Sequence, residues 1–351
     1  MSKTISYDVP TPQNIIVRVP NWLGDLVMCT PTIHDLKAHW PQAKLTALCQ
    51  GRLGEMLSHD PHIDEIVTYK NPQHSNTLKT HKDVILHLQQ HKYDLGLLLT
   101  NSFSSAWCFW RGNVANRIGY AMHWRQWLLN YPVTVSKNIN QQHLVQTYKM
   151  LLAPLHIPIS PTHPKLYLAD NELEEAKTLL AKYGVLKSEY LIGINPGAAF
   201  GSAKCWLPER FKELSLRLLQ NPNIKIVFFG DQTNAALIQS IVQDLATTKI
   251  INLVNKTSLR QLMSLLKQCS VFLGNDSGPT HAASALGVPL VALFGPTTEA
   301  ISGPNRVNNI IISEHVPCSP CFRRTCPIDS RCMQRITVER VYQAILQLLP
   351  S

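Results

Sequence analysis

Short apolar runs alternate with amphipathic stretches in the first half of the chain. Strand-like runs begin at Asn14, Lys44, Glu65 and Tyr93, and residues 78–91 and 140–156 have the apolar spacing of helices. Mostly apolar strands separated by helices are typical of a parallel sheet that is covered on both faces. The pattern therefore predicts a doubly wound α/β domain.

The same alternation restarts after a proline-rich segment. Residues 157–170 contain three prolines, which neither continue a helix nor donate fully to a sheet, so we predict a linker there. A helix then begins near Asn171, and strand-like runs recur in YLIGINPG, KIVFFG, IINLVN, SVFLGN and PLVALFG. We predict an N-terminal domain over 1–160, a C-terminal domain over 170–335, and a helix over 336–351, N-capped by Thr337, that packs back on the body.

Composition agrees with two folded domains, since the chain has 351 residues, 45% of them hydrophobic and 16% charged. No apolar run approaches the roughly 18 residues of a membrane span, and the opening residues lack an apolar signal region, so we expect a cytoplasmic protein. A net charge of +10 favours anionic partners. Nucleic acid is not expected, because no long basic run, zinc-finger spacing or RNP-like motif occurs.

The first candidate site follows the strand at Asn14 and reads NWLGDLVMCTP. Ligands of open parallel sheets bind beyond the carboxyl ends of the strands. Gly24 permits a tight turn there, Asp25 follows it, and the helix start offers unpaired backbone N–H groups. Asp25 either faces a ligand or caps its helix, and capping is the commoner role of a lone aspartate at such a turn.

The second candidate site, PGAAFGSAKCWLPERF, follows the run YLIGIN. Its small residues let the backbone approach an anion closely, and Lys204 supplies a positive charge for the oxygens of a leaving diphosphate. The alternative is a solvated lysine in a flexible loop.

The third candidate site, DSGPTHAASALGVPLVALFGPT, follows the run SVFLGN. The amides of Ser277 and Gly278 at a helix N-terminus suit a phosphate group. Asp276 and His281 are close enough in sequence to face the same site. Each alone is explained by a capping aspartate or a core histidine, but the whole block favours a nucleotide diphosphate.

Together the three blocks resemble the signature segments of the lipopolysaccharide heptosyltransferase family, glycosyltransferase family 9, in the order and halves of that family. The resemblance covers essentially the whole chain. It implies a GT-B fold, with two Rossmann-like doubly wound domains that face a central cleft. The N-terminal domain would bind the acceptor and the C-terminal domain would bind ADP-heptose, which is a substrate, so no cofactor is required.

The resemblance also implies roles for single residues. Asp25 matches the family's catalytic base and Lys204 its diphosphate-contacting lysine, and both are expected to be catalytic. The residues expected at the donor are Gly24, Ala199, Ser202, Lys204, Asp276, Ser277, Gly278 and His281. Where relatives place threonine hydroxyls just before the lysine, this chain has Ala199 and Phe200, so phosphate contacts there would rest on backbone amides and Ser202.

The activity that the resemblance implies is inverting transfer of a heptose from ADP-L-glycero-D-manno-heptose to a heptosyl-Kdo-lipid A acceptor. The partners would be ADP-heptose, the lipid-linked inner-core oligosaccharide and the anionic surface at the inner face of the inner membrane. Type I or type III acceptor specificity stays open. So do a GT-B nucleotide-sugar epimerase and a non-catalytic sugar-nucleotide binder.

Four cysteines near the C-terminus form a separate motif. Cys318, Cys321, Cys326 and Cys332 are close enough in sequence to suggest a four-thiolate zinc or iron-sulfur site, although the spacing matches only partly. The family's chemistry resembles a metal-independent process, so no metal is predicted. An ordered loop with free thiols, or one disulfide, is the preferred interpretation.

Overall fold

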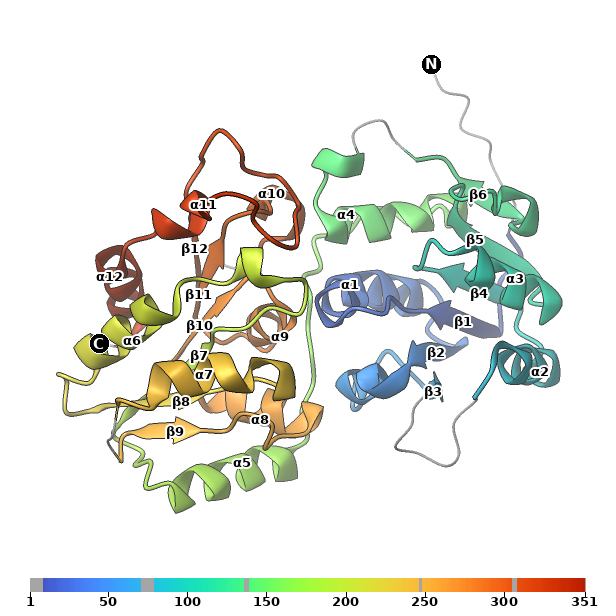
Figure 1. Cartoon of the computed structure of the whole chain (residues 1–351). Coiled ribbons are helices and arrows are strands. Elements are labelled where there is room, and N and C mark those ends of the chain that lie inside the picture. The colour runs from blue at the N-terminus through green and yellow to red at the C-terminus, as the bar shows by residue number, and fades with distance from the viewer. Residues whose placement is uncertain (1–8, 71–78, 136–138, 246–247, 305–307, 351) are drawn as a thin grey trace. The chain divides into compact units, whose positions relative to one another are not determined.

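The computed structural model describes residues 9–70, 79–135, 139–245, 248–304 and 308–350. The chain divides into two compact units, Met1–Tyr167 and Leu168–Ser351. Each unit holds one six-stranded sheet with helices on both faces (Figure 1). This confirms the predicted fold class, two doubly wound α/β domains.

Unit 1 has the strand order of a Rossmann-type sheet, β3-β2-β1-β4-β5-β6, with every pair parallel. Its strands are β1 (Asn14–Arg18), β2 (Lys44–Gln50), β3 (Glu65–Tyr69), β4 (Leu95–Leu98), β5 (Asn116–Tyr120) and β6 (Tyr131–Val133). Its α-helices are α1 (Leu23–His39), α2 (His81–His91), α3 (Phe103–Arg111) and α4 (Leu144–Lys149). Its 3₁₀ helices are η1 (Gly51–Leu57), η2 (Gln126–Leu128), η3 (Ile139–Gln141) and η4 (Met150–Leu155). Helix α1 packs against α4, and α2 packs against α3.

Two helix predictions in unit 1 need adjustment. The helix expected over 140–156 is instead η3, α4 and η4, and Pro154 inside η4 has no N–H with which to continue an α-helical ladder. The helix expected over 78–91 is α2, which begins behind its N-cap Thr80, and residue 78 lies outside the described residues. The predicted linker has no helix or strand from residue 157 to residue 169.

Unit 2 repeats the topology of unit 1, because its order β12-β11-β10-β7-β8-β9 is the same order when strands are counted from β7. Its strands are β7 (Tyr190–Asn195), β8 (Ile224–Phe228), β9 (Ile250–Asn252), β10 (Val271–Asn275), β11 (Leu290–Phe294) and β12 (Asn309–Ser313). Its α-helices are α5 (Asp170–Lys182), α6 (Pro208–Leu218), α7 (Ala235–Val242), α8 (Leu259–Gln268), α9 (Gly278–Ala285), α10 (Glu299–Ser302), α11 (Arg331–Gln334) and α12 (Val338–Leu348). Its 3₁₀ helices are η5 (Ser202–Lys204) and η6 (Gln232–Asn234).

The last helix belongs to the core of unit 2. Thr337 is its N-cap, as predicted, with the Thr337 hydroxyl accepting a hydrogen bond from the Arg340 N–H at 3.3 Å. Val341 and Ile345 on α12 are fully buried in the same cluster as Trp206 and strands β7, β8, β10 and β11. Within the described ranges, no helix has the length and apolar character needed to cross a bilayer.

Candidate functional site

The strand order of unit 2 reverses between β7 and β10, and at such a point doubly wound sheets bind their ligands. The loop after β7 carries Lys204, and the turn after β10 carries Asp276 and leads into α9. The fold therefore brings the second and third sequence blocks together at one edge of the sheet.

Asp276 is the centre of this edge and is 5% exposed. The Lys204 Nζ atom lies 2.5 Å from Asp276 Oδ2, and His281 Nε2 lies 3.3 Å from Oδ1. Thr297 donates its hydroxyl hydrogen bond to Oδ2 at 2.7 Å. Burial alone would raise the pKa of Asp276, but the hydrogen bond and charge of His281, with the charge of Lys204, hold it well below its usual range.

These contacts decide two alternatives left open by the sequence. Lys204 is not a solvated lysine, since its side chain is 12% exposed and its Nζ also lies 4.8 Å from the centre of the Phe200 ring. Asp276 does not cap α9, whose N-cap is Ser277. An ammonium group has three N–H donors, so the ion pair leaves Lys204 with donors for phosphate oxygens.

The start of α9 presents backbone amides beside Asp276. The Ser277 hydroxyl makes no capping bond and instead lies 3.2 Å from the Thr280 hydroxyl. The first N–H groups of a helix have no partner within the helix, so those of Ser277 and Gly278 suit an anion.

A buried asparagine that the sequence analysis missed fixes the Lys204 loop. Asn275 is fully buried, its Oδ1 accepts from the Trp206 N–H at 3.1 Å, and its Nδ2 donates to the Pro196 carbonyl at 2.7 Å. Both ends of the loop are thus tied to β10. Thr297 was missed by the sequence analysis as well. Its place in the glycine turn after β11, within the third block, could have identified it as a site residue.

The loop that contains Cys318, Cys321 and Cys326, here called the cysteine-containing loop, contacts the loop that carries Lys204. The Arg324 carbonyl accepts a hydrogen bond from the Ala203 N–H at 3.0 Å. Gly201 has a φ of +154°, and a Cβ there would come within 2.2 Å of the Arg324 oxygen. Ala199 and Ser202 stay exposed in the braced loop. The tail motif therefore supports the candidate phosphate loop through backbone contacts.

The four tail cysteines are all free thiols. Cys318 and Cys321 are exposed, Cys326 is half-buried and Cys332 is buried. Among the described residues, no three of these sulfur atoms lie within 4.8 Å of one another. Burial raises the pKa of the Cys332 thiol, and Cys318, Cys321 and Cys326 are close enough to raise it further.

A different trio in unit 1 has the proximity of metal ligands. His34 Nε2 and His62 Nδ1 each lie 2.9 Å from an oxygen of the buried Asp60, and their rings stack at 4.1 Å. Two imidazoles and a carboxylate are a ligand set that zinc accepts. Both rings already bond to Asp60, which explains the trio equally well as a hydrogen-bonded core contact.

The first sequence block lies in unit 1, where the strand order reverses between β1 and β4. Asp25 is in the first turn of α1, and the N-cap position is held by Trp22, whose side chain makes no capping bond. A carboxylate in a first turn is stabilised by the helix dipole. Burial and then the negative charge of Asp25 raise the pKa of Tyr148 on α4.

Gly24 precedes Asp25 in α1, so this expected donor residue lies in unit 1, whereas the other seven expected donor residues lie in unit 2.

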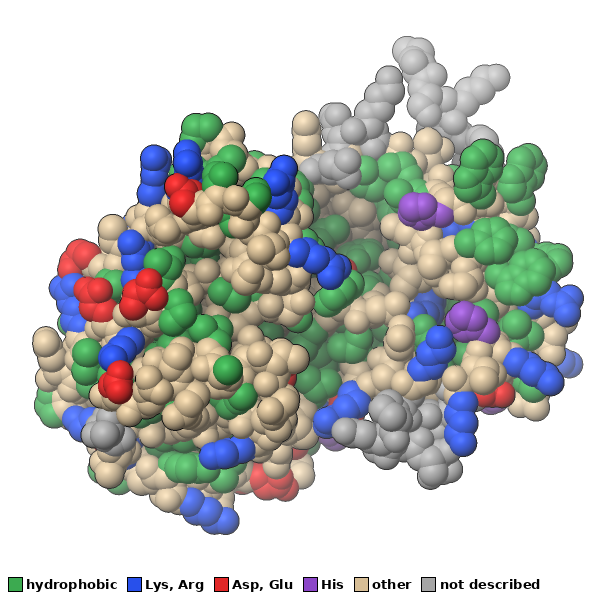
Figure 2. Space-filling view, in the orientation of Figure 1, with side chains coloured by type: hydrophobic (Ala, Val, Ile, Leu, Met, Phe, Trp, Pro, Cys, Tyr) green, Lys and Arg blue, Asp and Glu red, His purple; other side chains and the backbone are tan. Residues whose placement is uncertain are grey.

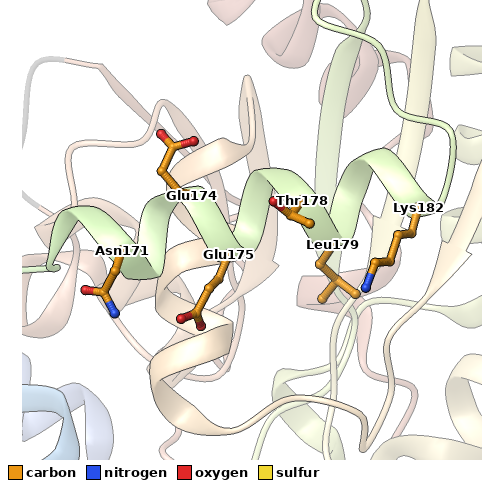
Figure 3. Close-up of a pocket in the computed structure, with 6 residues that line it drawn as sticks. All are labelled: Asn171, Glu174, Glu175, Thr178, Leu179 and Lys182. Atoms are coloured by element: carbon orange, nitrogen blue, oxygen red, sulfur yellow. The ribbon is translucent and has the colours of Figure 1, made fainter.

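A surface hollow on α5 has no comparable chemistry. It is lined by Asn171, Glu174, Glu175, Thr178, Leu179 and Lys182. Figure 3 shows that all six side chains belong to one helix, and that Glu174 points away from Glu175 rather than toward a shared centre. The hollow is an ordinary feature of a helix surface.

Comparisons with known proteins agree with this geometry. The model of glycosyltransferase family 9 (heptosyltransferase) matches residues 83–331. Lipopolysaccharide heptosyltransferase 2 of Salmonella typhimurium is 30% identical over 86% of this chain and 89% of its own length. Lipooligosaccharide heptosyltransferase 2 of Campylobacter jejuni is 26% identical over 95% of this chain and 98% of its own length.

A solved structure extends the likeness to three dimensions. The structure of E. coli ADP-heptose lipopolysaccharide heptosyltransferase II matches with a TM-score of 0.81 and 25% identity, covering 95% of this chain and 98% of that one. The family match spans more than half of the chain and includes both loops of the unit 2 site. This chain therefore belongs to glycosyltransferase family 9, the heptosyltransferases, and is a glycosyltransferase.

Proposed function

We propose that this chain transfers a heptose from ADP-L-glycero-D-manno-heptose to a heptosyl-Kdo-lipid A acceptor in lipopolysaccharide core biosynthesis. The observation that carries the proposal is the Lys204, Asp276 and His281 cluster beside the N-terminus of α9, at the point where doubly wound sheets bind nucleotides. The relatives named heptosyltransferase 2 favour the type II acceptor.

Unit 2 would hold the donor. Lys204 and the amides of Ser277 and Gly278 would contact the diphosphate and stabilise the negative charge that grows there as the sugar leaves. Asp276 acts as a positioning residue, because its carboxylate holds the Lys204 ammonium at 2.5 Å. One donor aimed at such a developing charge is typically worth about 3–4 kcal/mol.

Unit 1 would hold the acceptor. The acceptor hydroxyl oxygen attacks the anomeric carbon from the side opposite the diphosphate, the bond from that carbon to the diphosphate oxygen breaks, and ADP leaves with the electron pair. Asp25 accepts the hydroxyl proton, and its place in the first turn of α1, at the edge where the sheet of unit 1 reverses its strand order, suits that role. The product has inverted configuration.

The lipid-linked acceptor would place the enzyme at the inner face of the inner membrane, as a cytoplasmic protein that docks peripherally. The net charge of +10 supports this, since the cytoplasmic leaflet is anionic.

A product assay tests the proposal. Purified singly heptosylated acceptor is incubated with ADP-heptose and the chain, and mass spectrometry follows the acceptor. A mass increase of one heptose is expected, together with release of ADP. An unchanged acceptor at every enzyme concentration would overturn the proposal, and isomerisation of donor incubated alone would identify an epimerase instead.

A further inference from the structure

Unit 1 displays five large aromatic side chains to solvent within a short stretch of sequence, here called the aromatic patch: Phe103, Trp107, Trp110, Trp124 and Trp127. On α3 the ring centres of Phe103 and Trp107 lie 6.3 Å apart, and those of Trp107 and Trp110 lie 5.1 Å apart. The segment with Trp127, η2, contacts α3. Figure 2 shows hydrophobic side chains gathered over this part of unit 1.

The exposure of α3 is a property of its sequence. One face of α3 is buried against the core, through Ser105, Ala106, Cys108 and Phe109. The opposite face exposes aromatic rings to solvent. The outward face of a helix that meets only water is normally polar, and contiguous exposed apolar patches mark interaction surfaces.

The two most exposed tryptophans stand on a firmly held loop. Trp124 and Trp127 are each 83% exposed, and Arg125 between them is fully buried. The Arg125 guanidinium donates to the Tyr120 carbonyl at 2.9 Å and to Asn101 Oδ1 at 3.2 Å, and burial lowers its pKa to about 10. Arg125 thus fixes the backbone from which both indole rings project.

Charge distinguishes the surroundings of the aromatic patch. Residues 95–169 contain no Asp or Glu, although the whole chain has 23 acidic residues, and they contain six Lys or Arg, of which Arg125 and Lys149 are buried. Arg111, exposed at the end of α3, has its guanidinium carbon 5.9 Å from the centre of the Trp110 ring. An anionic partner therefore meets no carboxylate from this half of unit 1.

The patch adjoins the edge of the sheet that carries Asp25. The segments with Phe103 and Trp124 leave the sheet at the carboxyl ends of β4 and β5, and α1 begins at the carboxyl end of the parallel strand β1. A partner surface that docks on the aromatic patch would therefore bring its molecules close to the sheet edge that carries Asp25.

We propose that the aromatic patch docks unit 1 on an anionic phospholipid bilayer, with the indole rings in the headgroup region and the acid-free surface facing the phosphates. Tryptophan favours that interface, and basic groups near it gain from anionic lipid. The inference rests on the proposed function, which supplies a lipid-anchored acceptor.

Vesicle binding tests the docking directly. The protein is sedimented with vesicles of phosphatidylethanolamine and phosphatidylglycerol and, separately, of phosphatidylcholine alone. Wild type should bind the anionic vesicles, more weakly at high salt, and the Trp124→Ser, Trp127→Ser double variant should bind at least about tenfold more weakly. The matched control exchanges the exposed apolar residue Leu216 of unit 2 for Ser and should bind as wild type.

Transfer assays separate docking from catalysis. The double variant should transfer heptose normally to detergent-dispersed acceptor and lose rate only on acceptor embedded in vesicles. Equal vesicle binding by wild type and the double variant would overturn the docking proposal, as would a dimer in sedimentation velocity that the double variant abolishes. Absence of transfer with intact, patch-dependent vesicle binding would overturn the proposed function alone.

Discussion

At the residue scale, buried charges organise the candidate donor site. Asp276 gathers Lys204, His281 and Thr297, and each contact orients a polar or charged group at the site. A carboxylate so deeply buried is tolerated because its partners offset the loss of hydration. Removing any partner leaves part of that charge uncompensated.

Acid is predicted to destabilise unit 2 through Asp276. The native pKa lies below the unfolded value of about 3.9, so the unfolded chain takes up the proton first as the pH falls. The contribution of Asp276 to stability is therefore complete above about pH 4 and is lost as the pH falls toward the native pKa. Free energies of unfolding measured across this range should depend less on pH in Asp276→Asn than in wild type.

The control for this titration is Asp244→Asn, which removes an exposed carboxylate paired with Lys212. It should keep the pH dependence of wild type. Identical pH dependence in Asp276→Asn and wild type would show that Asp276 carries no such linkage.

Replacing the loop lysine is predicted to impair transfer. Lys204→Ala should lower kcat/KM by about 10²–10³-fold, because one aimed donor to the developing diphosphate charge is lost. Lys212→Ala, which removes a half-exposed lysine of the same unit, should leave kcat/KM unchanged. Steady-state kinetics with ADP-heptose measures both, and wild-type kinetics in Lys204→Ala would remove Lys204 from the mechanism.

At the scale of elements, the apolar pattern predicts strands that lie inside the sheets better than strands at their edges. The runs located β1 to β4 and β7 to β11, whereas β5, β6 and β12 were missed. The missed strands β6 and β12 pair on one side only, as do the located strands β3 and β9, and Pro132 in β6 is acceptable only at such an edge. In β5, the sequence NRIGY alternates too briefly to stand out.

A buried ion pair joins α1, α4 and the linker within unit 1. Lys149 Nζ lies 3.3 Å from Asp35 and 2.7 Å from the hydroxyls of Ser160 and Thr162. Lys149→Met should lower the free energy of unfolding by about 3–5 kcal/mol, because Asp35 is left charged and buried. Urea unfolding measures the change.

An exposed pair serves as the comparison. Lys177 and Glu174 pair at 2.6 Å on the surface of α5, so Lys177→Met should cost about 0–1 kcal/mol. Equal losses in the two variants would contradict the structural role given to Lys149.

The contact between the cysteine-containing loop and the Lys204 loop gives a second prediction at this scale. Gly201→Ala should destabilise unit 2 and weaken ADP binding by about tenfold or more, because the new Cβ meets the Arg324 carbonyl. Calorimetry measures both effects. Gly184 also has a positive φ, +72°, but a Cβ there would meet only the flexible end of Lys225, so Gly184→Ala should leave ADP affinity unchanged.

At the scale of the whole molecule, the sequence could predict the three blocks and the family, since each block is local. It could not predict how Asn275 ties down Trp206 or how Arg324 braces Ala203, because these partners are far apart in the chain. Such contacts exist only once the two halves of a sheet have assembled. The glycine turn after β11 predicted a site, but it did not predict that the Thr297 hydroxyl would donate a hydrogen bond to Asp276.

The most direct test of the proposed transfer asks whether the Asp25 carboxylate of unit 1 is needed for the reaction. Transfer of one heptose to singly heptosylated acceptor is followed by mass spectrometry in wild type, Asp25→Asn and Asp83→Asn. Asp83 is the matched control, a carboxylate in the first turn of another helix of unit 1. Asp25→Asn should bind ADP like wild type but lose about 10²–10⁴-fold in transfer rate, while Asp83→Asn keeps the wild-type rate. Wild-type turnover by Asp25→Asn would contradict the proposed role of Asp25.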